Sequence, residues 1–153
     1  MAAEFCSHNN QEVERINTLE VFTSERSFQI ASCRMSHQQL LIRSGAFHGK
    51  TNLDIVFYGV LYMDIKWSMQ GIAIHTDNDE YDNYFHNRIE NLKDDVLKKS
   101  KNNEDKDTYW NKIGYKSFFI NSNDDIYIII ALKMSFGENT LNASEDVLVG
   151  IPS

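Results

Sequence analysis

The segment from Ile126 to Phe136 restricts the fold of this chain more than any other. Every second residue from Ile126 to Phe136 is apolar, and the intervening Tyr127, Ile129 and Ala131 are apolar as well. Alternation with a period of two is typical of a β-strand, and a strand that is apolar on both faces needs cover on both. As an exposed edge it would recruit other chains and aggregate. We therefore expect this segment in the middle of a sheet.

Several other segments have strand patterns. They are Leu19–Phe22, Ser27–Met35, Gln39–Ser44, Leu53–Lys66, Gln70–His75, Tyr115–Ile120 and a short candidate at Val147–Val149. Gly59 interrupts the longest of them, and a glycine inside a strand often marks a bulge or bend. We expect one bent strand or two short ones there.

One helix is predicted after the fifth of these segments. Its apolar residues follow a helical period, and carboxylates at its start and lysines at its end suit the helix dipole. The apolar stripe consists of Phe85, Ile89, Leu92 and Val96. Residues Ser100 to Thr108 contain no apolar side chain and are predicted to form a surface loop. The helix should therefore pack on the sheet along one face.

These patterns predict an α+β fold, a curved antiparallel β-sheet or half-barrel of six or seven strands with one helix packed on it. The length of 153 residues suits a single domain, 1–153, in which residues 1–15 form a flexible lead-in. The sequence leaves the strand order and the oligomeric state open.

The charge balance argues against direct nucleic-acid binding. Fifteen basic and 22 acidic residues give a formal charge of -7, whereas affinity for phosphate backbones comes from lysine and arginine. No apolar run is long enough to span a membrane. The first ten residues lack the basic start and apolar run of a signal peptide, and the two cysteines, Cys6 and Cys33, suggest free thiols. We expect a cytoplasmic protein.

No catalytic motif is recognisable, and the sequence predicts no cofactor and no metal. The five histidines do not occur at metal-ligand spacings. One polar set, His37, Arg43 and Asp54, allows two interpretations. Arg43 and Asp54 could form an ion pair between neighbouring strands on the outer face. Alternatively, all three could converge in a cleft that acts on a phosphate ester.

Acidic residues flank the predicted helix. Ten acidic and six basic residues occur between Asp77 and Asp107. We predict that this region binds a basic protein partner, with Trp110 as an aromatic anchor. The predicted partner-binding residues are Asp77, Asp79, Glu80, Asp82, Glu104, Asp105, Asp107 and Trp110. The alternative is a favourable helix start followed by a solvated loop.

A calcium loop is a third interpretation of the same region. Asp77 and Asp79 have the spacing with which such loops begin. The sixth and twelfth positions, however, hold Asp82 and Arg88 in place of the required glycine and glutamate.

Three blocks, Ser36–Ser44, Asn52–Val60 and Gly71–Ile74, carry a resemblance. Over about a quarter of the chain they resemble small bacterial immunity proteins of contact-dependent inhibition and polymorphic-toxin systems. The resemblance implies an antitoxin that binds a toxin domain, often a basic nuclease, and blocks its active site. It implies no catalytic residues.

Two other classes of function stay open. One is a small hydrolase that uses His37, Arg43 and Asp54. The other is a ligand-binding domain with an internal void lined by residues such as Phe57, Ile128 and Ile130.

Overall fold

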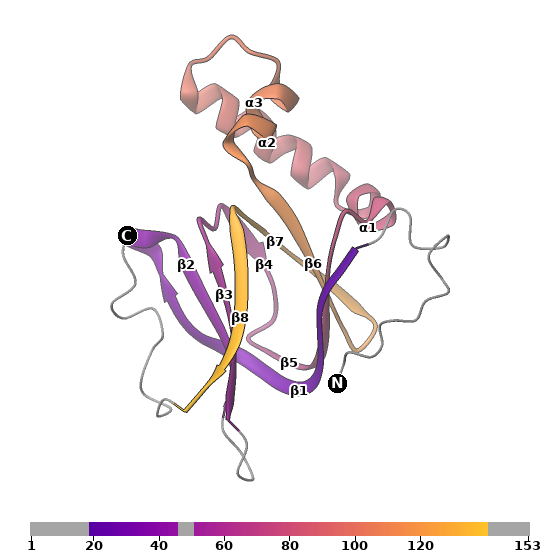
Figure 1. The fold of residues 1–153 in the computed structure, drawn as a ribbon. Coiled ribbons are helices and arrows are strands. Elements are labelled where there is room, and N and C mark those ends of the chain that lie inside the picture. Colours follow the sequence, from indigo (N-terminus) through magenta and orange to yellow (C-terminus); the bar gives the residue numbers. More distant parts are fainter. Residues whose placement is uncertain (1–18, 46–50, 141–153) are drawn as a thin grey trace.

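The computed structural model describes residues 19–45 and 51–140, so the lead-in 1–15 and the candidate strand Val147–Val149 lie outside the described residues. The fold is α+β, with an antiparallel sheet and helices packed on one side of it (Figure 1). The strands are β1 (Leu19–Arg34), β2 (Gln39–Ser44), β3 (Asn52–Tyr58), β4 (Tyr62–Asp64), β5 (Ser68–Thr76), β6 (Lys116–Ser122), β7 (Asp125–Ala131) and β8 (Lys133–Asn139). The helices are α1 (Asp79–Tyr84), α2 (His86–Ser100) and α3 (Lys106–Ile113), and a 3-10 turn, η4 (Met35–His37), joins β1 to β2.

The eight strands of the described part follow the order β4-β7-β6-β5-β1-β2-β3-β8, and every neighbouring pair is antiparallel. The sheet is strongly curled, and its edge strands β4 and β8 do not pair with each other (Figure 1). This agrees with the expected curved antiparallel sheet, although the described residues form eight strands, where six or seven were expected.

A bend at Gly59 connects the two ends of the sheet. The chain passes from β3 into β4 there, while β7 passes into β8 opposite it, so that Tyr58 pairs with Lys133 and Tyr62 with Ile130. Gly59 has a φ of 65°, and a Cβ at this position would lie 2.6 Å from a side-chain carbon of Leu132. Glycine therefore permits both the backbone angle and the close crossing. The expected interruption at Gly59 is confirmed.

The concave face of the sheet encloses the main core. Phe57 of β3 and Phe118 of β6 meet there with ring centroids 5.4 Å apart, although three strands separate β3 from β6 in the sheet order. Such a contact is possible only because the sheet curls. The buried members of this core are Phe28, Leu40, Ile42, Ile55, Phe57, Met69, Ile72, Ile74, Phe118, Ile120, Ile129 and Ala131.

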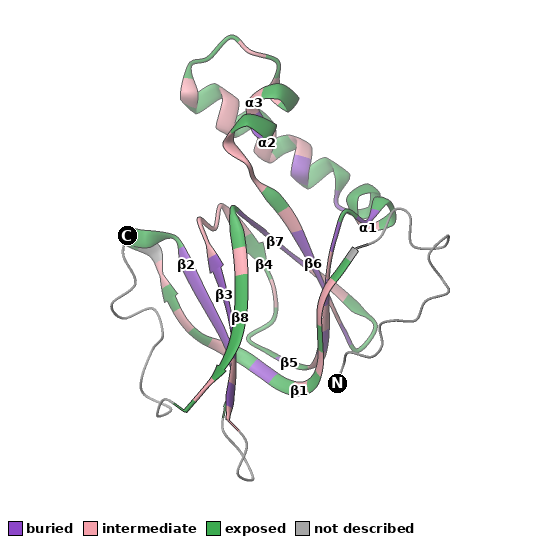
Figure 2. Cartoon of the chain, in the orientation of Figure 1, coloured by how far each residue is buried: buried purple, intermediate pink, exposed green. Residues whose placement is uncertain are grey.

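The helices cover the outer face of β6 and β7. Ile128 and Ile130 pack there beneath Ile89 of α2, and the Phe85 and Phe119 rings stack at 5.9 Å. Ile129 of the same strand faces the concave core, so β7 is covered on both faces (Figure 2). The expected two-sided strand is confirmed for Asp125–Ala131, but the rest of the segment that was expected in the middle of the sheet, Lys133 to Phe136, belongs to the edge strand β8, where Phe136 is 53% exposed. The proposed void lined by Phe57, Ile128 and Ile130 is wrong, because Phe57 lies on the opposite face from the two isoleucines.

The number of helices differs from the expected one. The predicted helix divides at Phe85 into α1 and α2, where the φ of -97° and ψ of 14° depart from helical values. The predicted surface loop also contains the start of α3. Asp105 is the N-cap of α3, because its side chain accepts a hydrogen bond from the Thr108 amide. Gly114, with a φ of 98°, ends this helix. No helix of the described part is long and apolar enough to span a membrane.

Strand boundaries also differ in two places. The two segments expected at Leu19–Phe22 and Ser27–Met35 form one long strand, β1, because the polar residues between them form a bulge near Ser24–Ser27. The single segment expected from Ile126 to Phe136 divides into β7 and β8 at the exposed Leu132.

Candidate protein-binding site

The first acidic group surrounds α1. Asn78 is the N-cap of this helix, because its side-chain oxygen accepts a hydrogen bond from the Tyr81 amide at 2.9 Å. All four, Asp77, Asp79, Glu80 and Asp82, are exposed, and none of them has a side-chain ion pair within residues 19–45 and 51–140. Partial burial raises the pKa of Asp82, and the negative charges of Asp79 and Asp77 raise it further. The positive charge of Lys93 acts in the opposite direction but does not outweigh these causes.

The second acidic group surrounds the start of α3, and its members have partners. Glu104 pairs with Lys112 at 2.6 Å, Asp107 pairs with Lys93 at 2.9 Å, and Asp105 caps α3. The hydrogen bond from Lys93 lowers the pKa of Asp107. These three residues thus join α2, α3 and the loop between them.

Lys93 and Lys106 extend this network along α2. Lys93 also approaches Glu90 at 3.3 Å, and Lys106 approaches both Glu90, at 3.0 Å, and Asp94, at 3.1 Å. The hydrogen bond from Lys106, followed by that from Lys93, lowers the pKa of Glu90. For Lys93, burial acts to lower the pKa, but hydrogen bonds to Asp107 and Glu90 outweigh it and raise the pKa.

The predicted aromatic anchor, Trp110, is buried, with 6% of its surface exposed. Its ring lies 5.0 Å from that of Tyr115, and the Lys93 ammonium lies 6.0 Å from its centroid. The exposed aromatic residue beside the first acidic group is instead Tyr84, at 72% exposed. It is the last residue of α1, one position before Phe85, and at helical spacing it therefore falls outside the apolar stripe that begins with Phe85.

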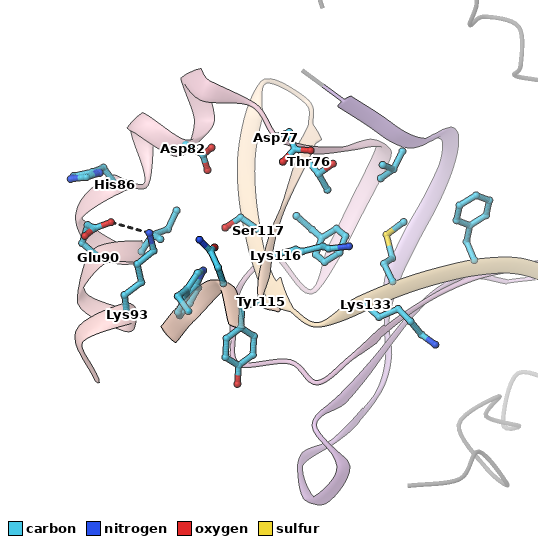
Figure 3. Close-up of a pocket in the computed structure, with 17 residues that line it drawn as sticks. Thr76, Asp77, Asp82, His86, Glu90, Lys93, Tyr115, Lys116, Ser117 and Lys133 are labelled. Carbon is cyan, nitrogen blue, oxygen red and sulfur yellow. Dashed lines mark ion pairs between the residues drawn. The ribbon is translucent and has the colours of Figure 1, made fainter. Parts of the chain in front are cut away.

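A pocket of about 790 Å³ opens between α1, α2, α3 and the ends of β5, β6 and β8 (Figure 3). Three predicted site residues line it, namely Asp77, Asp82 and Trp110. Asp79, Glu80, Glu104, Asp105 and Asp107 are not among its lining residues. The predicted set is therefore divided between the pocket, the exposed side of α1 and the α2–α3 network.

Arg43 and Asp54 form an ion pair between β2 and β3. They are directly opposite in register, and the Arg43 Nε donates to Asp54 at 2.7 Å while Nη2 donates to the other oxygen at 3.0 Å. Both residues alternate with core residues such as Ile42 and Ile55, so the pair is on the outer face, yet its side chains are only 6% and 4% exposed. The cross-strand interpretation of this pair is confirmed.

His37 does not join that pair. It is exposed in the 3-10 turn before β2, and Gln39 to Arg43 alone spans roughly 13 Å of extended strand. The proposed convergence of His37, Arg43 and Asp54 in one cleft is therefore wrong.

Among residues 19–45 and 51–140, no group of three or more histidine, cysteine or acidic side chains is arranged to hold a metal ion. The two aspartates with calcium-loop spacing, Asp77 and Asp79, are part of the exposed acidic group at α1.

Comparison of the chain with protein-family models, with curated proteins and with solved structures found no match.

Proposed function

We propose that this protein is an inhibitory binding protein of the immunity type. In this proposal it acts in the cytoplasm, binds a basic toxin domain of the nuclease class, and blocks the active site of that toxin. It works by occlusion and contributes no catalytic residue of its own.

The observation that carries the proposal is the unpaired acidic group at α1. The negative charges of Asp79 and Asp77 help to raise the pKa of Asp82, and a positively charged partner would relieve that repulsion. An acidic surface also accelerates encounter with a basic protein and selects against acidic ones.

Tyr84 supplies the apolar part of the proposed contact. It is largely exposed on α1, its ring packs edge-on against Phe85 with centroids 4.8 Å apart, and tyrosine is enriched among residues that dominate binding energy. Trp67 is also exposed, but it precedes β5 whereas Asp77 follows its last residue, so the length of β5 separates it from α1.

The direct test is capture of the gene product encoded immediately upstream, followed by measurement of its nuclease activity with and without this protein. We expect binding and loss of activity. A neighbour that does not bind would contradict the proposal.

Two matched double variants locate the contact. Asp79→Asn with Glu80→Gln removes two charges from α1, and Asp95→Asn with Asp124→Asn removes two exposed charges elsewhere. We expect the first to weaken binding at least about tenfold and the second to change it less than about twofold, because close charge pairs dominate such coupling. Equal losses in both would show that only net charge matters and would contradict a site at α1.

A further inference from the structure

Strands β2 and β3 are buried on both faces, although the helices lie over β6 and β7 (Figure 2). Leu41 of β2 and Val56 of β3 pair directly on the outer face, with 0% and 5% of their surface exposed. The Arg43–Asp54 ion pair continues this buried band. Among the described residues, the hydrophobic side chain packed against Leu41 and Val56 is Tyr58, from the same face. A side chain that stands out from a sheet is shielded from water only when atoms lie above it, so the band needs a cover.

The buried band is two strands wide. On one side of it, Gln29 of β1, which pairs with Arg43, is exposed. On the other side, Ser135 of β8, which pairs with Val56, is exposed as well. Neighbouring strands lie about 4.8 Å apart, so the band is about 10 Å wide. That is the width of a single chain segment with its side chains, not of a second sheet.

The cover must come from this chain, because the burial is that of a single chain. The segments outside the described residues are 1–18, 46–50 and 141–153. The second is tied at both ends beyond Ser44 and can fold back over about 8 Å, whereas Leu41 is about 10 Å from Ser44. The first joins Leu19, which pairs with Thr76 of β5 and lies about 33 Å of strand before Gln29.

Residues 141–153 follow directly from the edge of the band. Asn139, the last residue of β8, accepts a hydrogen bond from Asn52 of β3 at 2.9 Å. From there, Leu41 is two strands across, about 10 Å, and four residues along the strands, about 13 Å. About seven extended residues span that path. This brings the apolar run of the segment, Val147–Val149, to the level of Leu41.

We propose that residues 141–151 lie along the outer face of β2 and β3 as a strap, with their apolar run over Leu41 and Val56. The strap closes the side of the sheet that the helices leave open. It also keeps water from the Arg43–Asp54 pair, whose hydrogen bonds are stronger in a low local dielectric. The inference is independent of the proposed function, whose residues are on and beside α1.

Thiol labelling of the full chain measures the cover. In a background with Cys6→Ser and Cys33→Ser, Val56→Cys puts the only thiol beneath the proposed strap, whereas Ile55→Cys puts it on the concave face. Serine at all three positions of Val147–Val149, the strap variant, removes the apolar cover. A maleimide should then label Val56→Cys at least about tenfold faster, while Ile55→Cys stays protected, because only one face of β3 is opened.

The matched control changes three apolar residues of the lead-in. Phe5→Ser, Val13→Ser and Ile16→Ser together should leave both labelling rates unchanged. Circular dichroism checks that each variant is folded.

Disulfide formation locates the strap without disturbing its apolar run as a whole. Val56→Cys is combined in turn with a cysteine at Val147, Leu148 or Val149, in the same background. Mild oxidation should close an intramolecular disulfide in at least one of these pairs, because the bond requires Cα atoms within about 7 Å. Val56→Cys with Val13→Cys should form none. Mass spectrometry of the unreduced digest identifies the linked peptides.

Four results would overturn the inference. They are unchanged labelling of Val56→Cys in the strap variant, equal acceleration at positions 55 and 56, faster labelling in the lead-in variant, and the absence of a disulfide from all three strap pairs. A disulfide to Val13→Cys would identify the lead-in as the cover instead, and one between two molecules would identify a second copy.

Discussion

The carboxylates around α1 and those around the start of α3 resemble each other in sequence but differ in their surroundings. Glu104 and Asp107 each have a lysine within 3 Å, and Asp105 caps a helix. The group at α1 has no such cation, and the pKa of Asp82 is raised as a result of burial and of its acidic neighbours. One group stabilises the helical layer, and only the other is available to a partner.

The difference comes from the positions of the lysines. No lysine or arginine occurs between Lys66 and Arg88, whereas Lys93, Lys106 and Lys112 surround the second group. An acidic group that is available to a partner is therefore better recognised by a local absence of opposite charge than by the number of carboxylates. Four experiments on stability test whether the two groups differ in this way.

The largest effect should come from Lys93→Met. The Lys93 side chain is only 18% exposed and holds Glu90 and Asp107, so its removal leaves Asp107 without its lysine and Glu90 with Lys106 alone. We expect a loss of about 1–2 kcal/mol, between the values for exposed and for buried ion pairs. Urea unfolding measures it, with the exposed Lys98→Met as control. A loss no greater than that of the control would show that the second group is not held by its lysine.

Low pH should remove most of the difference in unfolding free energy between the natural protein and Lys93→Met. The Lys93 hydrogen bond is the main cause of the lowered pKa of Asp107 in the folded state, and it also lowers the pKa of Glu90, after Lys106. The stabilisation by Lys93 is therefore present above the unfolded pKa values of these carboxyls and is lost as the pH falls through the folded ones. The two stability curves, of the natural protein and of Lys93→Met, should converge below about pH 4. Curves that stay parallel from pH 7 to pH 3 would contradict the assignment.

Asp105→Ala should lower the free energy of unfolding by about 1 kcal/mol, as much as Lys93→Met or less, because the substitution removes the N-cap of α3. Asp79→Ala, on the other group, should change stability by less than about 0.5 kcal/mol, as usual for exposed positions. Thermal unfolding of both variants compares the two roles directly. Equal losses would remove the distinction between a structural and an available carboxylate.

The smallest effect, and one of opposite sign, should come from Asp82→Asn. A raised pKa means that the folded state binds the proton more tightly, so stability falls as the pH rises through the window above the unfolded pKa. Removal of the charge should leave stability equal or raise it by up to about 0.5 kcal/mol at pH 7. A clear loss at pH 7 would show that Asp82 has a favourable partner.

The sequence pattern predicted those features of the fold that depend on the residues of a single segment. The two-sided β7, the bend at Gly59 and the apolar stripe of α2 all belong to this class. Helix α3 was missed because its signal consists of a cap at Asp105 and a glycine at Gly114, which surround a segment with little apolar periodicity.

The division of the acidic residues was not predictable in the same way. Lys93 and Asp107 meet only because the chain turns between α2 and α3, and the sequence pattern does not specify the path of that turn. Arg43 and Asp54 could be anticipated as an alternative because their strands are close in sequence, whereas the burial of the pair depends on the packing of the whole fold.

The crossing at Gly59 has a consequence for the order in which the molecule can assemble. β4 pairs with β7, and β3, which already pairs with β2, has β8 as its second neighbour, so one edge of each of these early strands is paired only by residues 125–139. Contacts so distant in sequence incur a large loop-closure entropy and slow folding. During synthesis on a ribosome, the first half of the chain would wait for these last strands before its sheet could be completed.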